Sequence, residues 1–131
     1  MEKKKILIIE DEQDMRFATK LLLECAGYEV ITASDGQEGL DKARIEKPDL
    51  ILLDLMLPKI DGYKVCRMLK FDRKYNKIPI IIFTVRSLEV DMEMGQDVGA
   101  DVYFIKPFKP DVLFGKIEEL LWDSKKETRV P

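Results

Sequence analysis

The chain has 131 residues, enough for one domain of ordinary size. Hydrophobic residues make up 46% of the sequence and charged residues 36%, which excludes a disordered chain and indicates a globular one. The net charge of -3 argues against direct binding to nucleic acid. The apolar runs are too short to cross a membrane, and no signal peptide is evident, so we expect a cytoplasmic protein.

Strand-like and helix-like segments alternate five times along the sequence. Nearly continuous apolar runs are typical of parallel strands that are covered on both faces. The alternation therefore predicts an α/β fold, a doubly wound (βα)5 sandwich with helices on both faces of one sheet. The predicted strands are Ile6–Ile9, Tyr28–Ala33, Leu50–Leu53, Ile78–Val85 and Val102–Ile105.

Apolar residues at helical spacing predict the helices between these strands. Gly27 stands where the first helix would end, and the second would begin after Ser34 or Asp35 and end before Pro48. The residues that show the spacing are Phe17, Ala18, Leu21, Leu22 and Cys25 in the first helix, Leu40 and Ala43 in the second, Val65, Met68 and Leu69 in the third, and Val112, Leu113, Ile117, Leu120 and Leu121 in the last.

Two further features concern the same helices. Ser87–Met94 has a period of two, but a strand there would break the alternation, so we expect a fourth helix that packs less firmly than the others. Cys25 and Cys66 lack the CxxC spacing and lie among helical apolar positions. We expect both to be reduced thiols in the core or half-buried.

Acidic residues follow two of the predicted strands directly. Glu10 and Asp11 come after the first strand, and Asp54 comes after the third. In parallel sheets such residues meet at the carboxyl edge, where two carboxylates about 4 Å apart would repel by roughly 4 kcal/mol at an effective dielectric constant of about 20. The sequence has no histidine, and oxygen ligands favour a hard cation, so we expect Mg²⁺, with Mn²⁺ able to substitute.

Four segments, in this order and spacing, resemble the receiver domain of two-component response regulators. They are I-L-I-I-E-D-E, D-L-I-L-L-D-L-M-L-P-K-I-D-G, I-P-I-I-I-F-T-V and G-A-D-V-Y-F-I-K-P-F. The resemblance covers residues 4–122. It implies a flavodoxin-like, chemotaxis-regulator-like sheet of order 2-1-3-4-5, with a receiver domain over residues 1–124 and a polar tail over residues 125–131.

The resemblance also implies a reaction at the acidic residues. Asp54 would accept a phosphoryl group from a sensor histidine kinase or a histidine phosphotransfer protein, in a Mg²⁺-dependent step. Glu10, Asp11 and Asp54 would bind the metal together with the backbone carbonyl of Met56. The chain would not be an enzyme beyond this self-phosphorylation and a slow self-dephosphorylation.

Three further residues are assigned by the resemblance to phosphoryl contact and switching. Thr84 and Lys106 would contact the phosphoryl group, with Lys106-Pro107 matching the cis bond of the family. Thr84 and Tyr103 would then change the face made by the fourth helix, fifth strand and fifth helix. That face would control an output protein, an output domain absent from this chain, or a phosphorylation-dependent homodimer, without direct contact with nucleic acid or a membrane.

Several positions depart from the pattern of the family. Val85 replaces a small residue and predicts slow phosphorylation by small donors, while Met56 and Arg86 occupy positions that modulate hydrolysis of the acyl phosphate. An apolar Met56 cannot orient water, so we expect a long-lived phosphoryl state. Val102 and Lys116 argue against a dimer built on the usual ion pairs of the family.

Other functions remain as alternatives. A phosphorylation-independent pseudo-receiver, acting as a protein interaction module, is the main one, because Glu10 and Val85 are unusual. A metal-dependent aspartyl phosphohydrolase would need a second acid at Met56. A flavodoxin-like cofactor module would need a phosphate-binding loop after the first strand, where acidic residues stand instead.

Overall fold

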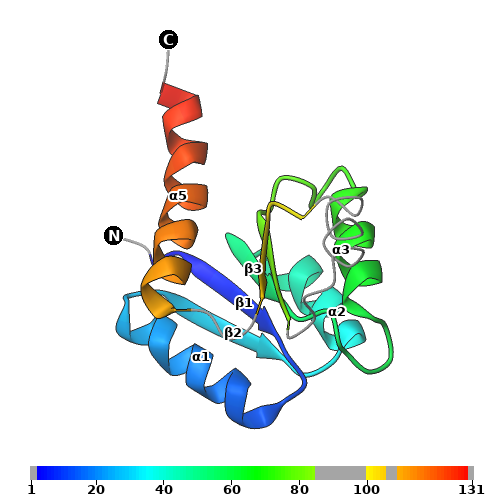
Figure 1. Cartoon of the computed structure of the whole chain (residues 1–131). Coiled ribbons are helices and arrows are strands. Elements are labelled where there is room, and N and C mark those ends of the chain that lie inside the picture. Colours follow the sequence, from blue (N-terminus) through cyan, green and yellow to red (C-terminus); the bar gives the residue numbers. More distant parts are fainter. Residues whose placement is uncertain (1–2, 85–99, 106–108, 130–131) are drawn as a thin grey trace.

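The computed structural model describes residues 3–84, 100–105 and 109–129. Five parallel strands form one sheet of order β2-β1-β3-β4-β5, which confirms the predicted fold and strand order (Figure 1). The strands are β1 (Lys5–Ile9), β2 (Glu29–Ala33), β3 (Leu50–Leu53), β4 (Ile80–Thr84) and β5 (Val102–Ile105). The helices are α1 (Gln13–Cys25), α2 (Gly36–Glu46), α3 (Gly62–Lys70) and α5 (Pro110–Arg129).

Some of the sequence predictions concern residues that lie outside or at the ends of the described ranges. The expected helix at Ser87–Met94 and the Lys106-Pro107 bond fall outside the described residues. The helix α5 continues to Arg129, so it includes most of the polar segment 125–131, and the domain boundary at residue 124 stays a prediction. None of the helices in the described part of the chain has the length and apolar character that a membrane span needs.

Helices cover both faces of the sheet, as the continuous apolar strands predict. Alternate residues of β1 and β3 point to opposite faces, and all of them except Lys5, at the start of β1, are buried. One face packs against α1 and α5, and the other packs against α2 and α3 (Figure 1). The helix residues in these two clusters are Leu23, Leu113, Ile117 and Leu121 on the first face, and Leu40, Ala43, Val65, Cys66 and Leu69 on the second.

The helix α1 packs through a face that the sequence did not indicate. Its buried residues are Thr19 and Leu23, whereas the side chains of Phe17, Leu21 and Leu22 are 61%, 46% and 40% exposed. The apolar spacing therefore identified the helix correctly but not its contact with the sheet. Gly27 does end the helix, with a φ of 98° and its N–H bonded to the carbonyl of Glu24.

The two cysteines differ in exposure. Cys66 is buried as expected, and burial raises the pKa of its thiol to about 12. Cys25 is exposed, so the expectation of a core or half-buried thiol was wrong there. The physical reason is the orientation of α1, which turns Leu23 rather than Cys25 toward the sheet.

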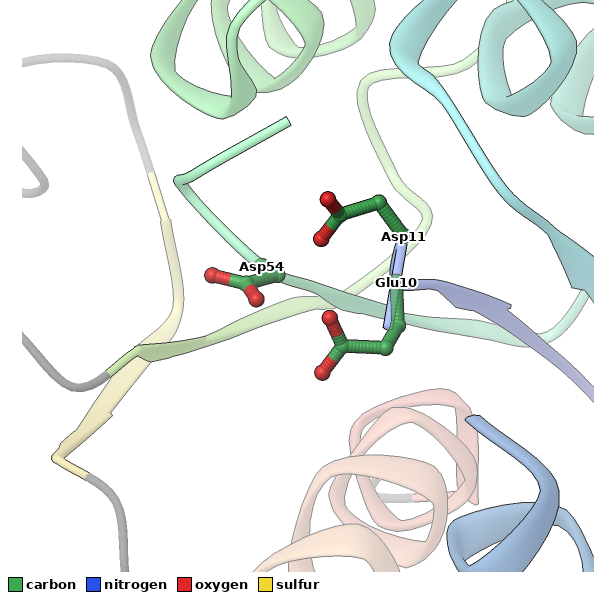
Figure 2. A group of neighbouring side chains, drawn as sticks. All are labelled: Glu10, Asp11 and Asp54. Carbon is green, nitrogen blue, oxygen red and sulfur yellow. The ribbon is translucent and has the colours of Figure 1, made fainter. Parts of the chain in front are cut away.

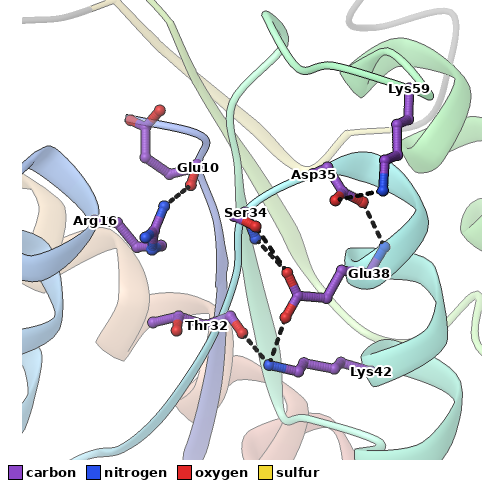
Figure 3. Close-up of polar contacts among 8 residues, drawn as sticks. All are labelled: Glu10, Arg16, Thr32, Ser34, Asp35, Glu38, Lys42 and Lys59. Carbon is purple, nitrogen blue, oxygen red and sulfur yellow. Dashed lines mark hydrogen bonds and ion pairs between the residues drawn. The ribbon is translucent and has the colours of Figure 1, made fainter. Parts of the chain in front are cut away.

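Polar contacts fix the start of α2, as the sequence predicted for Ser34 and Asp35. Asp35 is the N-cap and accepts a hydrogen bond from the N–H of Glu38 at 2.8 Å. The carboxylate of Glu38 accepts from the N–H and hydroxyl of Ser34 at 2.8 and 3.0 Å and pairs with Lys42 at 2.9 Å (Figure 3). These contacts, first the Ser34 N–H, lower the pKa of Glu38 to about 2. Lys42 also donates to the carbonyl of Thr32 in the edge strand β2.

A second polar cluster, centred on Lys70 and Asp101, lies where β4 and β5 begin. The Lys70 ammonium, 11% exposed, lies 2.9 Å from the carboxylate of Asp101 and also donates to the carbonyls of Asn76 and Ile78. The same carboxylate accepts from the N–H of Ile80, the first residue of β4, at 2.8 Å. This cluster ties the end of α3 to the beginnings of β4 and β5.

Candidate metal centre at the carboxyl edge of the sheet

Neighbouring strands bring the predicted acidic residues together. Ile9 and Leu53 are paired in the parallel ladder between β1 and β3, so the residues after them leave the sheet at the same level. The Asp54 N–H donates to the Ile9 carbonyl at 3.0 Å, and the Glu10 N–H donates to Ala33 at 3.0 Å. The backbone is therefore held in the ladder up to the acidic residues themselves.

The three carboxylates gather where β1 and β3 end (Figure 2). One oxygen from each of Glu10, Asp11 and Asp54 can be chosen so that all three lie within 4.8 Å of one another. The convergence predicted from the strand ends is thus observed. Glu10 and Asp54 are 1% and 5% exposed, while Asp11 is exposed to solvent.

This donor set fits a hard divalent cation. All three donors are carboxylate oxygens, which Mg²⁺ prefers as ligands. The oxygens are close enough to bind one ion together, whereas without a cation their negative charges repel one another. At this separation each pair of charges repels by about 3 kcal/mol for an effective dielectric constant of about 20. A bound cation would remove that repulsion, and exposed Asp11 leaves the site in contact with water, which Mg²⁺ retains as additional ligands.

Arg16 holds the backbone of the acidic pair from the first turns of α1. Its guanidinium donates to the carbonyl of Glu10 at 2.9 Å (Figure 3). It also donates to the carbonyl of Asp11 at 3.3 Å. Sequence analysis missed this residue, because an arginine in a helix next to acidic residues is indistinguishable from a solvated charge. Arg16 also lines a groove of about 390 Å³ together with Phe17 and Lys20.

The loop after β3 holds the carboxylate of Asp54. The Met56 N–H donates to Asp54 Oδ1 at 3.1 Å, and the Met56 side chain is 53% exposed. Gly62 begins α3 directly against this backbone, with its N–H bonded to the Leu55 carbonyl at 3.0 Å. A Cβ at position 62 would collide with the Asp54 carbonyl oxygen. A single glycine at the start of a helix gives no signal of such a contact in the sequence, so the approach of Gly62 to the Asp54 backbone was missed.

The other predicted site residues are placed only in part. Thr84 ends β4, where its backbone pairs with Ile105, and Tyr103 pairs with Ile82. The Tyr103 side chain is partly buried against the cluster that α2 and α3 share with the sheet, and its hydroxyl oxygen is buried. Val85, Arg86 and Lys106 lie outside the described residues, so their roles stay predictions.

Comparison with known sequences identifies relatives of this chain. The family model "Response regulator receiver domain" matches residues 6–118. Bacillus subtilis alkaline phosphatase synthesis transcriptional regulatory protein PhoP is 45% identical over 122 residues, 93% of this chain and 50% of that protein. Response regulator ArlR of Staphylococcus aureus is 46% identical over 116 residues, 88% of this chain and 52% of that protein. The chain spans about half the length of these curated relatives.

Solved structures agree with the sequence relatives. A CheY-like response regulator receiver domain protein from Methanospirillum hungatei has a TM-score of 0.90 at 32% identity, covering 96% of this chain and 99% of that chain. The receiver domain of sensor histidine kinase PA1611 from Pseudomonas aeruginosa has a TM-score of 0.85 at 29% identity, covering 92% and 98%. That neighbour has a magnesium ion coordinated in its active site cleft.

Proposed function

The chain belongs to the response regulator receiver domain family, and from that premise we propose that Asp54 accepts a phosphoryl group in a Mg²⁺-dependent reaction. The observation that carries this proposal is the gathering of Glu10, Asp11 and Asp54 at one edge of the sheet. Relatives that are transcriptional regulators, and a structural neighbour with magnesium in its active site cleft, support it.

The proposed chemistry is transfer from a phosphohistidine. A carboxylate oxygen of Asp54 attacks the phosphorus, an O–P bond forms, and the P–N bond to the donor breaks with its electron pair returning to the imidazole. Glu10, Asp11, Asp54 and the Met56 carbonyl would hold Mg²⁺, which when bound neutralises charge on the acceptor and the phosphoryl oxygens. The Met56 N–H orients the Asp54 carboxylate by its hydrogen bond to Oδ1.

Switching is proposed to follow from the same contacts. Phosphorylation adds close to two negative charges and strong acceptor oxygens beside Asp54. Thr84 and Lys106 would contact these oxygens, and Tyr103 would adjust as Thr84 moves. The expected result is a population shift at the face that β5 and α5 would form with the helix expected at Ser87–Met94, and this face would control the output partner.

The surface of α1 supports a protein as the phosphoryl donor. The exposed apolar side chains of Phe17, Leu21 and Leu22 lie on the helix that starts two residues after Asp11, and the exposed side chain of Met56 lies on the loop that follows Asp54. An apolar surface beside a reactive site suits a helical protein donor, such as a histidine kinase or a histidine phosphotransfer protein. Cys25 and Cys66 form no disulfide with each other, which is consistent with a cytoplasmic reaction.

Intact-mass measurement of phosphoryl uptake tests the proposal. Wild type and Asp54→Ala would each be incubated with an autophosphorylated histidine kinase, and separately with acetyl phosphate, with and without Mg²⁺. We expect uptake of one phosphoryl group that needs Mg²⁺ and is lost in Asp54→Ala. Glu12→Gln, which changes an exposed acid outside the cluster, is the matched control and should retain uptake.

The two donors also separate docking from chemistry. Phe17→Ser should slow transfer from the kinase while leaving uptake from acetyl phosphate unchanged, because Phe17 is exposed on α1 and outside the carboxylate cluster. Mg²⁺ binding without uptake from either donor would contradict the proposal and favour the phosphorylation-independent interaction module.

A further inference from the structure

The loop between β3 and α3 determines how the acceptor carboxylate is held. This loop, residues 55–61, contributes the Met56 N–H that donates to Asp54 Oδ1 at 3.1 Å. A shift of the loop would lengthen that hydrogen bond and move the Met56 carbonyl. Whatever fixes the loop therefore also fixes the geometry of the site.

Lys59, in the same loop, has an unusual backbone conformation. Its φ is 69°, in the left-handed region that glycine adopts easily and a lysine adopts at a cost. Lys47 also has a positive φ, but it caps the end of α2, where this conformation is common. Lys59 caps no helix but is the central residue of a tight turn, in which the Ile60 N–H donates to the Pro58 carbonyl at 2.9 Å, and such backbone outliers often occur beside functional sites.

The side chain of Lys59 forms an ion pair with the residue that precedes α2. Its ammonium lies 3.3 Å from Asp35 Oδ2, and the Asp35 side chain is only 15% exposed (Figure 3). The pKa of Asp35 is lowered, first by the hydrogen bond from the Glu38 N–H and then by Lys59. Asp35 is thus fixed as the N-cap of α2 on one side and attracts the loop on the other.

A backbone contact at Gly36 joins the same two segments. The Gly36 N–H points to the Pro58 carbonyl at 3.4 Å, and a Cβ at position 36 would collide with the Ile60 carbonyl oxygen. The absence of a side chain at Gly36 allows the loop to lie directly against the first turn of α2. The ion pair acts where the two backbones already touch.

We propose that Lys59 is a positioning residue for the acceptor site: its ion pair with Asp35 fastens loop 55–61 to α2 and so keeps the Met56 N–H on the Asp54 carboxylate. The part that concerns metal binding and phosphorylation rests on the proposed function. The part that concerns the hydrogen bond at Asp54 does not. Because Lys59 is 68% exposed, the ion pair contributes little to the overall stability, and its effect is local.

The test compares Lys59→Met and Asp35→Asn with wild type. Asparagine caps helices about as well as aspartate, so Asp35→Asn removes the charge while keeping the cap. Lys59→Arg keeps the positive charge. Lys64→Met is the control, because the Lys64 side chain is exposed and only its backbone N–H bonds to Asp61. Three quantities are measured: amide hydrogen exchange at Met56 without metal, the Kd for Mg²⁺ by calorimetry, and the midpoint of urea unfolding.

We expect exchange at the Met56 amide to become about three- to five-fold faster in Lys59→Met and in Asp35→Asn, with the Asp54 amide unchanged because the ladder holds it. The Kd for Mg²⁺ should rise by a similar factor of about three to five in both variants. Lys59→Arg should stay within about two-fold of wild type, and the double variant should be no worse than either single one.

The outcomes separate the two levels of the proposal. Unchanged exchange at Met56 in both variants, matching Lys64→Met, would overturn the positioning role whether or not Mg²⁺ binds. If exchange at Met56 is faster in both variants but the wild-type protein binds no Mg²⁺, the proposed function is contradicted and the positioning role of Lys59 is retained. A large fall in the urea midpoint, together with faster exchange at every amide, would show general unfolding and would also overturn the proposal.

Discussion

Replacement of Gly62 by alanine tests how closely α3 approaches the backbone of Asp54. An added Cβ would collide with the Asp54 carbonyl oxygen and would lie 2.5 Å from Leu55 Cα and 3.0 Å from the Asp54 carbonyl carbon. Among the glycines of the described chain, Gly27 is the one with a positive φ, so alanine meets no dihedral penalty at position 62. The cost of Gly62→Ala is therefore steric.

The size of this cost follows from the atoms involved. All three are backbone atoms, so no side chain can rotate away, and α3 or the end of β3 must move by roughly half an ångström or more. Overpacking of this kind typically costs about 1–3 kcal/mol, and the higher helix propensity of alanine returns less than about 1 kcal/mol. We expect Gly62→Ala to lower the free energy of unfolding by about 1–2 kcal/mol and to raise the Kd for Mg²⁺ about ten-fold.

Gly115→Ala is the matched control in another helix. A Cβ at Gly115, inside α5, would meet no atom within 4 Å, so alanine should stabilise the protein by up to about 1 kcal/mol and leave Mg²⁺ binding unchanged. Urea unfolding gives the free energies, and calorimetry gives the Kd for Mg²⁺. A Gly62→Ala variant as stable as Gly115→Ala, with the Mg²⁺ affinity of wild type, would refute the close approach.

Three other predictions concern stability and reactivity. Folding lowers the pKa of Glu38 to about 2 from an ordinary value near 4.3, so its contribution is complete above pH 5 and is lost as the pH falls toward 2. Glu38→Gln should therefore cost about 1 kcal/mol at pH 7, discounted for solvent exposure, and match wild type near pH 2 in urea unfolding; an equal cost at both pH values would contradict this. Asp101→Asn should cost about 2 kcal/mol, because it leaves the Lys70 ammonium without its carboxylate, and a cost under about 0.5 kcal/mol would show that the pair is unimportant. Iodoacetamide should label exposed Cys25 at least about a hundred-fold faster than Cys66 in the native protein, as peptide mass mapping would reveal; equal rates would mean that Cys66 is accessible.

The sequence predicted the sheet and the acidic cluster well, for related reasons. Continuous apolar runs such as Leu50–Leu53 occur where both faces of a strand are covered, and the residue after each run must lie at the edge. The strand order places β1 next to β3, so the backbone pairing of the two strands is sufficient to bring Glu10 and Asp54 together. A site built on strand ends can therefore be inferred from the pattern of the sequence.

The missed features depend on contacts between distant side chains and backbone. Arg16 and Gly62 contact backbone atoms of other segments, and Lys59 pairs with the side chain of Asp35; such contacts leave no periodic signal in the sequence. The packing of α1 was missed for another reason. Its apolar residues outnumber those that can face the sheet, so spacing alone could not show that Leu23 is buried while Phe17 is exposed.

The Lys70–Asp101 cluster has a consequence for how the domain can respond to modification. It anchors the amino ends of β4 and β5, far along the strands from the carboxylates that follow β1 and β3. With one end of these two strands fixed, the switch proposed for Thr84 and Tyr103 would turn the other end without sliding the strands past each other. We therefore expect the register between Ile81 and Val102 to be the same in every signalling state, so that the response is an angular one.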